Sequence, residues 1–318
     1  MVAAQTLPRC RFFSLEEIAD GVYAALAVEG VGTGANAGIV DLGGATIVFD
    51  TFRIPRAGAE LRAVAETLTG RPVTYVINSH WHRDHTYGTQ SFPGVPVIAT
   101  PLTREIIQKQ GQKRLEEGLR ETEKAVQANA ARLAETLDET ERRRLATTLN
   151  DNREFLADLP LVRLVLPTLT FTDRICFHGS KRTAELITYG PAHSPSDGFL
   201  YLPGDAVALM GDILSVQTHP NMTHGDADRW LDTLEKVQAL DLSCALPGHG
   251  PIGTKADIAL LAQYIRDVKA LVGQLYESGA TPEQAATAPV PAAYSQWAEI
   301  RFFRKSISDL YAKVAVRP

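Results

Sequence analysis

Cysteine is scarce in this sequence, with only Cys10, Cys176 and Cys244 among 318 residues. An odd, scattered set of three excludes the paired framework that staples small secreted domains. Cys176 and Cys244 stand in apolar stretches, so we expect both to be small core residues, whereas Cys10 lies near the start and could face solvent. No neighbouring group that would stabilise a thiolate is evident, so we expect no cysteine chemistry.

The sequence also lacks a basic stripe and a long apolar run. Its formal net charge is -5 and its basic residues alternate with acidic ones, which argues against nucleic acid as a partner. No segment reaches the ~18 to 20 uncharged apolar residues that span a bilayer, and residues 1–27 show no signal-peptide pattern. We therefore expect a soluble cytoplasmic protein that contacts neither nucleic acid nor membrane.

The segments that are present alternate between strand-like and helical patterns. This alternation indicates an α/β layered domain, and we expect residues 1–318 to form a single domain with residues 278–318 as a helical C-terminal extension. Glycine-split β-prone runs occur from residue 21 to about 50, with a hairpin turn at Gly43-Gly44. The remaining patterns predict a helix at 57–68, strands at 73–78 and 95–100, strands again from about 161 to 202, and helices at 226–240 and 255–277.

Residues 103–158 interrupt this alternation with a long charged stretch nearly free of glycine and proline. We predict an inserted helical hairpin, in which Asp138 followed by Glu141 caps the second helix and Leu145 and Leu149 lie on its apolar face. Such a stripe must be buried against something, and it fits a lid, a homodimer interface or a self-packed decoration. The stripe on the first helix consists of Leu115, Leu119, Val126, Ala130, Leu133 and Leu137.

The most informative segment is Asn78-Ser79-His80-Trp81-His82-Arg83-Asp84-His85. Four side chains that can bind metal fall within six residues, directly after an apolar strand. His80 and His82 are two apart, so in an extended chain they project from one face, and Asp84 and His85 follow where the chain turns. Histidine and aspartate clustered at this spacing are typical of a metal site. We expect Trp81 to pack in the core.

This segment resembles the His-x-His-x-Asp-His hallmark of the metallo-β-lactamase superfamily. Three further motifs follow in the order of that family, over residues 20 to 260: the Gly190-Pro-Ala-His193 segment, the Gly211-Asp212 pair, and Pro247-Gly-His249-Gly. The resemblance implies the α/β four-layer αβ/βα sandwich of the metallo-β-lactamase fold, here with a helical hairpin insertion and a helical C-terminus. It also implies two zinc ions per chain.

The resemblance assigns the metal ligands residue by residue. His80, His82 and His193 would bind the first zinc ion, while Asp84, His85 and His249 would bind the second. Asp212 would bridge the two ions. The same nitrogen and oxygen donors would also accept manganese or iron.

The chemistry implied is hydrolysis by a metal-bridging hydroxide that attacks a carbonyl, because bound water becomes acidic near neutral pH. Asp84 is the catalytic candidate, as a ligand that can also carry a proton. Outer residues should orient the ligand histidines, and the candidates for this role are Asp50, Ser79, Ser194 and Asp197.

Departures from the family pattern bear on the substrate. Ala192 stands where the family often has glycine, Ser194 replaces a common threonine, and Asp212 is a residue commoner in glyoxalase II-like and general hydrolases than in true β-lactamases. We therefore expect an ester, lactone, thioester or lactam as substrate, with β-lactamase activity left open. His219 and His224, which follow Asp212, could contact the substrate or be solvent-facing loop residues. Two other functions stay open: a single-iron thiol or persulfide dioxygenase of the same fold, and a non-catalytic binding scaffold.

Overall fold

The computed structural model describes residues 7–315. The chain divides into two compact units, Met1–Glu185 and Leu186–Pro318, and the expectation of a single domain stays a prediction. The absence of a signal-peptide pattern is predicted for residues 1–27, of which residues 1–6 lie outside the described residues. Within residues 7–315, no helix combines the length and the apolar character needed to cross a membrane.

The first unit is built on a mixed sheet of seven strands in sequential order. Strands β1 to β4 pair antiparallel, as glycine-split meandering strands should, and β4 to β7 pair parallel. The strands are β1 (Phe13–Ala19), β2 (Val22–Ala27), β3 (Ala37–Asp41), β4 (Thr46–Phe49), β5 (Tyr75–Ile77), β6 (Val97–Ala99) and β7 (Leu169–Thr170).

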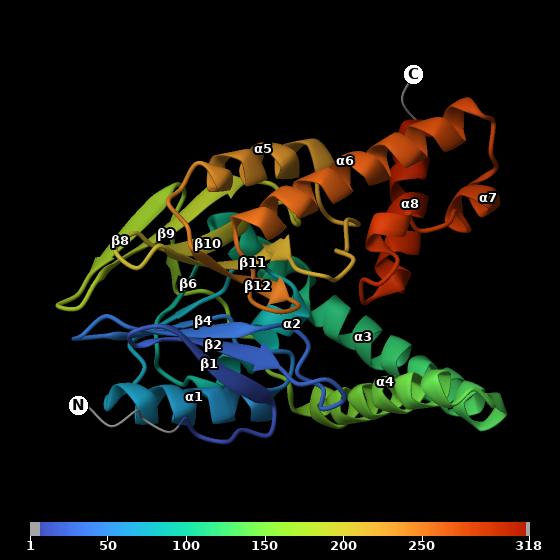
Figure 1. Ribbon diagram of the computed structural model, residues 1–318. Helices are drawn as coiled ribbons and strands as arrows, with labels where there is room; N and C mark the ends of the chain where they lie inside the picture. Colours follow the sequence, from blue (N-terminus) through green and yellow to red (C-terminus); the bar gives the residue numbers. More distant parts are fainter. Residues whose placement is uncertain (1–6, 316–318) are drawn as a thin grey trace. The chain divides into compact units, whose positions relative to one another are not determined.

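Helix α1 (Pro55–Thr69) covers one face of this sheet (Figure 1). Proline at its first turn and Gly70 in the left-handed conformation after its last turn are the usual start and stop of a helix. Its apolar face, with Leu61 and Ala65, packs in the same core cluster as Ile39 and Val48 of the sheet. Short helices follow β5, namely α2 (Arg83–Thr86) and the 3-10 helix η1 (Tyr87–Ser91).

The expected helical hairpin is present as α3 (Pro101–Glu135) and α4 (Glu139–Asp158), followed by the 3-10 helix η2 (Leu159–Leu161). The side chain of Asp138 accepts a hydrogen bond from the Glu141 backbone N–H at 2.8 Å and caps α4. Leu145 and Leu149 are buried as expected. Leu137, expected on the apolar stripe, is instead 94% exposed, because it lies in the connection between the two helices.

The second sheet has five strands in the order β12-β11-β10-β9-β8. It is also mixed, since β10 and β11 pair antiparallel while β11 and β12 pair parallel. The boundary between the units falls within β9. The strands are β8 (Arg174–His178), β9 (Thr183–Gly190), β10 (Asp197–Leu202), β11 (Val207–Ser215) and β12 (Cys244–His249).

Helices α5 (Ala227–Gln238) and α6 (Lys255–Glu277) bury their apolar faces in the core of the second unit. Trp230 of α5 and Ile258 of α6 share this core with Met210 of β11. The C-terminal segment is helical as expected and adds α7 (Pro282–Ala286), the 3-10 helix η3 (Ala292–Tyr294) and α8 (Ile300–Ala315). Two mixed sheets with flanking helices, a long helical insertion and C-terminal helices thus confirm the expected fold class.

One sequence-based expectation about the core is wrong. Cys176 is exposed, although it stands in an apolar stretch, and Cys244 is only partly buried. Cys176 lies on the solvent side of β8, whose neighbour Phe177 faces inward. Because side chains alternate between the two faces of a strand, an apolar run in a peripheral strand does not bury every member.

Candidate metal centre

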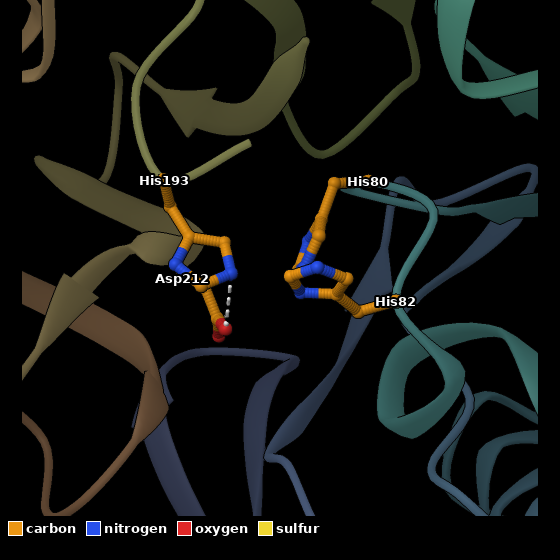
Figure 2. A group of neighbouring side chains, drawn as sticks. All are labelled: His80, His82, His193 and Asp212. Atoms are coloured by element: carbon orange, nitrogen blue, oxygen red, sulfur yellow. Dashed lines mark ion pairs between the residues drawn. The ribbon is translucent and has the colours of Figure 1, made fainter. Parts of the chain in front are cut away.

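The segment from Asn78 to His85 leaves the buried end of β5 and turns into the four-residue helix α2. His80 and His85 are fully buried, while His82 and Asp84 are half-buried. The rings of His80 and His82 lie edge to face with centroids 4.5 Å apart (Figure 2). The carboxylate of Asp84 lies 4.0 Å from Nε2 of His85. The first unit therefore presents four candidate ligands within one short segment.

A buried carboxylate, Asp50, orders this segment from the end of β4. Its oxygens accept hydrogen bonds from the backbone N–H and the hydroxyl of Ser79, each at 2.8 Å, and one oxygen lies 2.7 Å from Nδ1 of His85. Burial raises the pKa of Asp50, and the hydrogen bonds from His85 and Ser79 oppose that shift. Asp50 and Ser79 thus lie where residues that orient ligand histidines are expected.

These hydrogen bonds determine which ring nitrogen each histidine offers. The hydroxyl of Ser79 donates its only proton to Asp50, so at 2.9 Å from Nδ1 of His80 it must accept a proton from that nitrogen. His85 likewise donates from Nδ1 to Asp50. In both rings Nε2 is then the unprotonated nitrogen that can bind a cation, an arrangement typical of metal-ligating histidines.

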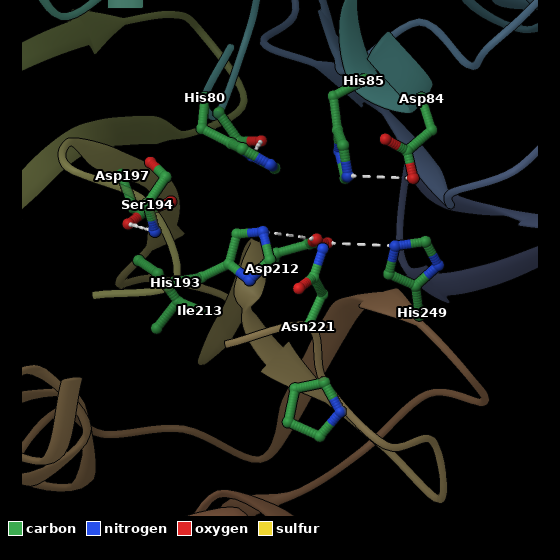
Figure 3. A network of polar contacts seen from close by, with 12 residues as sticks. His80, Asp84, His85, His193, Ser194, Asp197, Asp212, Ile213, Asn221 and His249 are labelled. Atoms are coloured by element: carbon green, nitrogen blue, oxygen red, sulfur yellow. Dashed lines mark hydrogen bonds and ion pairs between the residues drawn. The ribbon is translucent and has the colours of Figure 1, made fainter. Parts of the chain in front are cut away.

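The second unit brings together His193, Asp212 and His249. One oxygen of Asp212 lies 3.1 Å from Nε2 of His193 and the other lies 3.4 Å from Nε2 of His249 (Figure 3). Asp212 occupies an irregular stretch of β11, where the pairing with β12 shifts register between Gly211 and Ser215. A bulge of this kind re-aims a side chain, which explains how a strand interior presents a carboxylate to two histidines.

Glycine at position 248 is required by the position of Asp212. A Cβ atom on Gly248 would lie 2.0 Å from an oxygen of the Asp212 carboxylate. The glycine that precedes His249 therefore lets β12 pass close to the acid. This contact gives a steric reason for the Pro247-Gly-His249 motif.

Asp197 and Ser194 hold the loop that carries His193. The buried carboxylate of Asp197 accepts hydrogen bonds from the backbone N–H groups of Ala192 and Ser194 at 3.2 and 2.8 Å. Burial raises the pKa of Asp197 to about 8, helped by the negative charge of Asp212 and opposed by the bonds from Ser194 and Ala192. Both residues therefore lie beside the candidate ligand, as expected of residues that orient it.

The two further histidines after Asp212 differ in their surroundings. His219 is 1% exposed and its ring lies among Tyr264, Trp297 and Phe303 at centroid distances of 5.5 to 5.7 Å. Its Nδ1 lies 3.0 Å from the Tyr264 hydroxyl. His219 therefore packs among aromatic side chains in the fold, and its contact with substrate stays a prediction. His224 is half-buried, and its contact with substrate stays a prediction.

Sequence reasoning missed two residues beside the candidate ligands. Trp230 lies edge to face with His193 at 5.4 Å and donates from its indole N–H to the Ile213 carbonyl at 2.9 Å, which packs α5 against the Asp212 strand. The side chain of Asn221 points toward Asp212 (Figure 3). The surrounding sequence does not indicate that either residue lies near the candidate ligands, because Trp230 has the pattern of an ordinary helix residue and Asn221 that of an ordinary loop residue.

Comparison with known proteins identifies related sequences and folds. The family model described as the Metallo-beta-lactamase superfamily matches residues 30–249. A curated relative, the linear primary-alkylsulfatase of Pseudomonas sp. (strain ATCC 19151), is 22% identical over 257 residues, which cover 75% of this chain and 46% of the relative. The chain thus spans less than half the length of that relative.

Two solved structures share the fold at low sequence identity. A metallo-beta-lactamase from Pontibacter korlensis is 16% identical with a TM-score of 0.59, over 80% of this chain and 99% of that one. A metallo-beta-lactamase from Erythrobacter litoralis, solved with beta-mercaptoethanol in its active site, is 17% identical with a TM-score of 0.59, over 82% and 100% of the two chains.

Proposed function

Because the chain belongs to the metallo-beta-lactamase superfamily, we propose that it is a dinuclear zinc hydrolase of a small-molecule ester, lactone, thioester or lactam. The proposed ligands are those of the family pattern: His80, His82 and His193 for one ion, Asp84, His85 and His249 for the other, with Asp212 shared. The observation that carries the proposal is the set of hydrogen bonds from Asp50, through Ser79 to His80 and directly to His85, which presents Nε2 of two buried histidines.

The donor set fits a divalent cation. Within the first unit, ligand atoms of His80 and His82 lie within 4.8 Å of one another, as do those of Asp84 and His85, and in the second unit the same holds for His193 and Asp212. Imidazole nitrogen and carboxylate oxygen are the donors that zinc prefers in catalytic sites. Burying this many polar groups costs free energy unless they are paired or coordinate a metal.

The residues around the donors have distinct tasks in this mechanism. Bound cations would acidify a water molecule and polarise the bond to be cleaved. Asp50 keeps the His85 ring in one orientation, and Asp197 does the same for the His193 loop. The side chain of Asp84 keeps 24% of its surface exposed, so it can accept a proton from water and release it to solvent.

A sulfate ester is the second candidate substrate. It is favoured by one observation, the 22% identity to a linear primary-alkylsulfatase. Such a substrate carries a negative charge and reacts at sulfur or at the ester carbon rather than at a carbonyl. A long-chain alkyl sulfate therefore belongs in the same assay as the neutral esters and lactams.

The test joins metal analysis to a hydrolysis panel. We expect about two zinc ions per purified chain and turnover of at least one ester, lactone, thioester, lactam or alkyl sulfate. Asp84→Ala should lose most of that turnover and bind zinc more weakly. Asp173→Ala, which changes an exposed aspartate outside the proposed ligands, is the matched control and should behave as wild type.

Three outcomes would contradict the proposal. One iron per chain with oxygen consumption on a thiol or persulfide would favour the dioxygenase. Absence of turnover across the whole panel with zinc loaded would favour a binding scaffold. Equal rates for wild type and Asp84→Ala would remove Asp84 from the mechanism.

A further inference from the structure

The helix that carries Asp84 and His85 is too short to be stable alone. Helix α2 has four residues, and isolated helices in water are marginal even at ~12 to 15 residues. Its conformation must therefore come from contacts made by its neighbours. Two residues of the segment that are not proposed ligands, Trp81 and Arg83, make such contacts with the α3–α4 hairpin.

Trp81 contacts the first helix of the hairpin. Its ring is 8% exposed, and the guanidinium carbon of Arg114 in α3 lies 4.0 Å from the ring centroid. The ring also lies edge to face with His82, with centroids 4.1 Å apart. Trp81 is thus held between a hairpin cation and a proposed ligand. A cation over the face of an indole is attracted by the negative charge of the ring face.

Arg83 contacts both helices of the hairpin. Its guanidinium carbon lies 5.3 Å from the ring centroid of Phe155 in α4. In α3, a Cβ atom on Gly118 would lie 3.2 Å from Nη1 of Arg83. Glycine inside a helix is less favourable than alanine, and at this position its absent side chain leaves room for the guanidinium.

The base of the hairpin is fixed on its other side as well. Asp151 of α4 accepts a hydrogen bond from the Gly32 backbone N–H at 2.8 Å and forms an ion pair with Arg53. Arg53 in turn donates to the Gly32 carbonyl at 3.0 Å. A Cβ atom on Gly34 of the same loop would lie 2.9 Å from Cβ of Asp84. The loop that contacts α4 therefore passes close to the proposed ligand Asp84, at a distance that only glycine allows.

We propose that the α3–α4 hairpin is a fixed brace for the metal-ligand segment, and that Arg83, an exposed residue whose guanidinium lies beside Gly118 and Phe155, is a positioning residue for Asp84 and His85. This inference rests on the proposed metal binding. The brace assigns the insertion a role distinct from a moving lid. It acts by keeping the short helix α2 in one conformation before a cation arrives, so its loss weakens metal affinity without removing a ligand.

The experiment separates metal affinity from stability. Zinc affinity of full-length protein is measured by competition with a chromophoric chelator, well below the melting temperature, for wild type, Arg83→Met, Gly118→Leu and the double variant. Gly273→Leu is the matched control, because Gly273 also lies inside a long helix, α6, and has open space around its Cβ. Leucine favours a helix over glycine at both positions.

We expect Gly273→Leu to raise the melting temperature and leave zinc affinity unchanged. Gly118→Leu should keep a melting temperature near that of wild type, because the gain in helix propensity offsets the lost contact with Arg83. Of the two zinc ions, it should bind the one with the lower affinity ~10-fold less tightly than wild type does, an effect typical of residues that orient ligands. Arg83→Met should do the same. The zinc affinity of the double variant should be no lower than that of either single variant, because both substitutions break the same contact between Arg83 and Gly118.

The brace is overturned if both single variants bind zinc as tightly as wild type, or if their effects add in the double variant. Wild-type protein that binds no zinc would overturn the proposed function and the brace together. Variants that bind zinc as tightly as a zinc-binding wild type would overturn the brace alone, so the two failures can be told apart. If Arg83→Met does not fold, Gly118→Leu decides the question alone.

Discussion

Replacing His219 with phenylalanine should change how the stability of this protein depends on pH. Burial lowers the pKa of His219 from 6.5 to about 4, against a hydrogen bond to the Tyr294 backbone that raises it. The folded state therefore favours the neutral ring, whereas the unfolded chain binds a proton near pH 6.5. Stability from this residue is complete above pH 6.5, falls as the pH drops toward 4, and then levels off. At pH 4 the loss amounts to about 3 kcal/mol.

The phenylalanine variant removes this titration and the hydrogen bonds of the ring to the Tyr264 hydroxyl and the Tyr294 backbone. Its ring should still fit among Tyr264, Trp297 and Phe303, but the Tyr264 hydroxyl loses the ring nitrogen at 3.0 Å. A buried hydroxyl left without a partner costs about 1–3 kcal/mol. The variant should therefore be less stable than wild type at pH 7.5 and about equally stable at pH 4.

Urea unfolding at pH 7.5, 6, 5 and 4 measures the difference between the two proteins. Taking the difference cancels the other titrating groups, so the gap isolates residue 219. The gap should close steadily between pH 6.5 and 4. A gap that stays constant over this range would refute the reasoning, because it would show that His219 titrates alike in the folded and unfolded chains.

Three further predictions concern single side chains. Asp50→Asn should lower zinc affinity about 10- to 100-fold in the same chelator competition, because the His85 ring loses a charged acceptor at 2.7 Å. Burial by itself raises the pKa of Asp41, but hydrogen bonds from Lys181, the Gly43 backbone and Arg71 hold this pKa below its ordinary value. Its stabilising effect is thus present above pH about 4 and lost on acidification, and Asp41→Asn should be less stable at neutral pH with a flatter acid limb in urea titrations. Asp138→Ala should cost about 1 kcal/mol in unfolding free energy, since it removes the cap of α4.

Much of the fold follows from local patterns in the sequence. The helix expected at 255–277 is found over Lys255–Glu277, because its apolar periodicity is strong and Thr254 with Asp257 forms a capping box at its start. The hairpin was recognisable for the same reasons, through its periodicity and the cap at Asp138. Periodicity fails where the chain is short or peripheral, as it does for Cys176.

The candidate ligands were recognisable because four of them fall in one short segment, and the other three appear in the order of a known family. What surrounds them depends on long-range packing that no local pattern encodes. Asp50 reaches Ser79 and His85 across 29 and 35 residues. His219 is enclosed by Trp297 and Phe303, which lie far along the chain, so a loop histidine in the sequence becomes a core residue in the fold.

The connection between α3 and α4 is a suitable place to attach a probe to this molecule. Leu137 at the far end of the hairpin is 94% exposed, and backbone at such a position tolerates insertions. A fluorophore or a short affinity peptide placed there would travel with the hairpin while leaving Arg83, Gly118 and Phe155 undisturbed. The fluorescence anisotropy of that probe, measured with and without zinc, would report directly whether the α3–α4 hairpin is rigid.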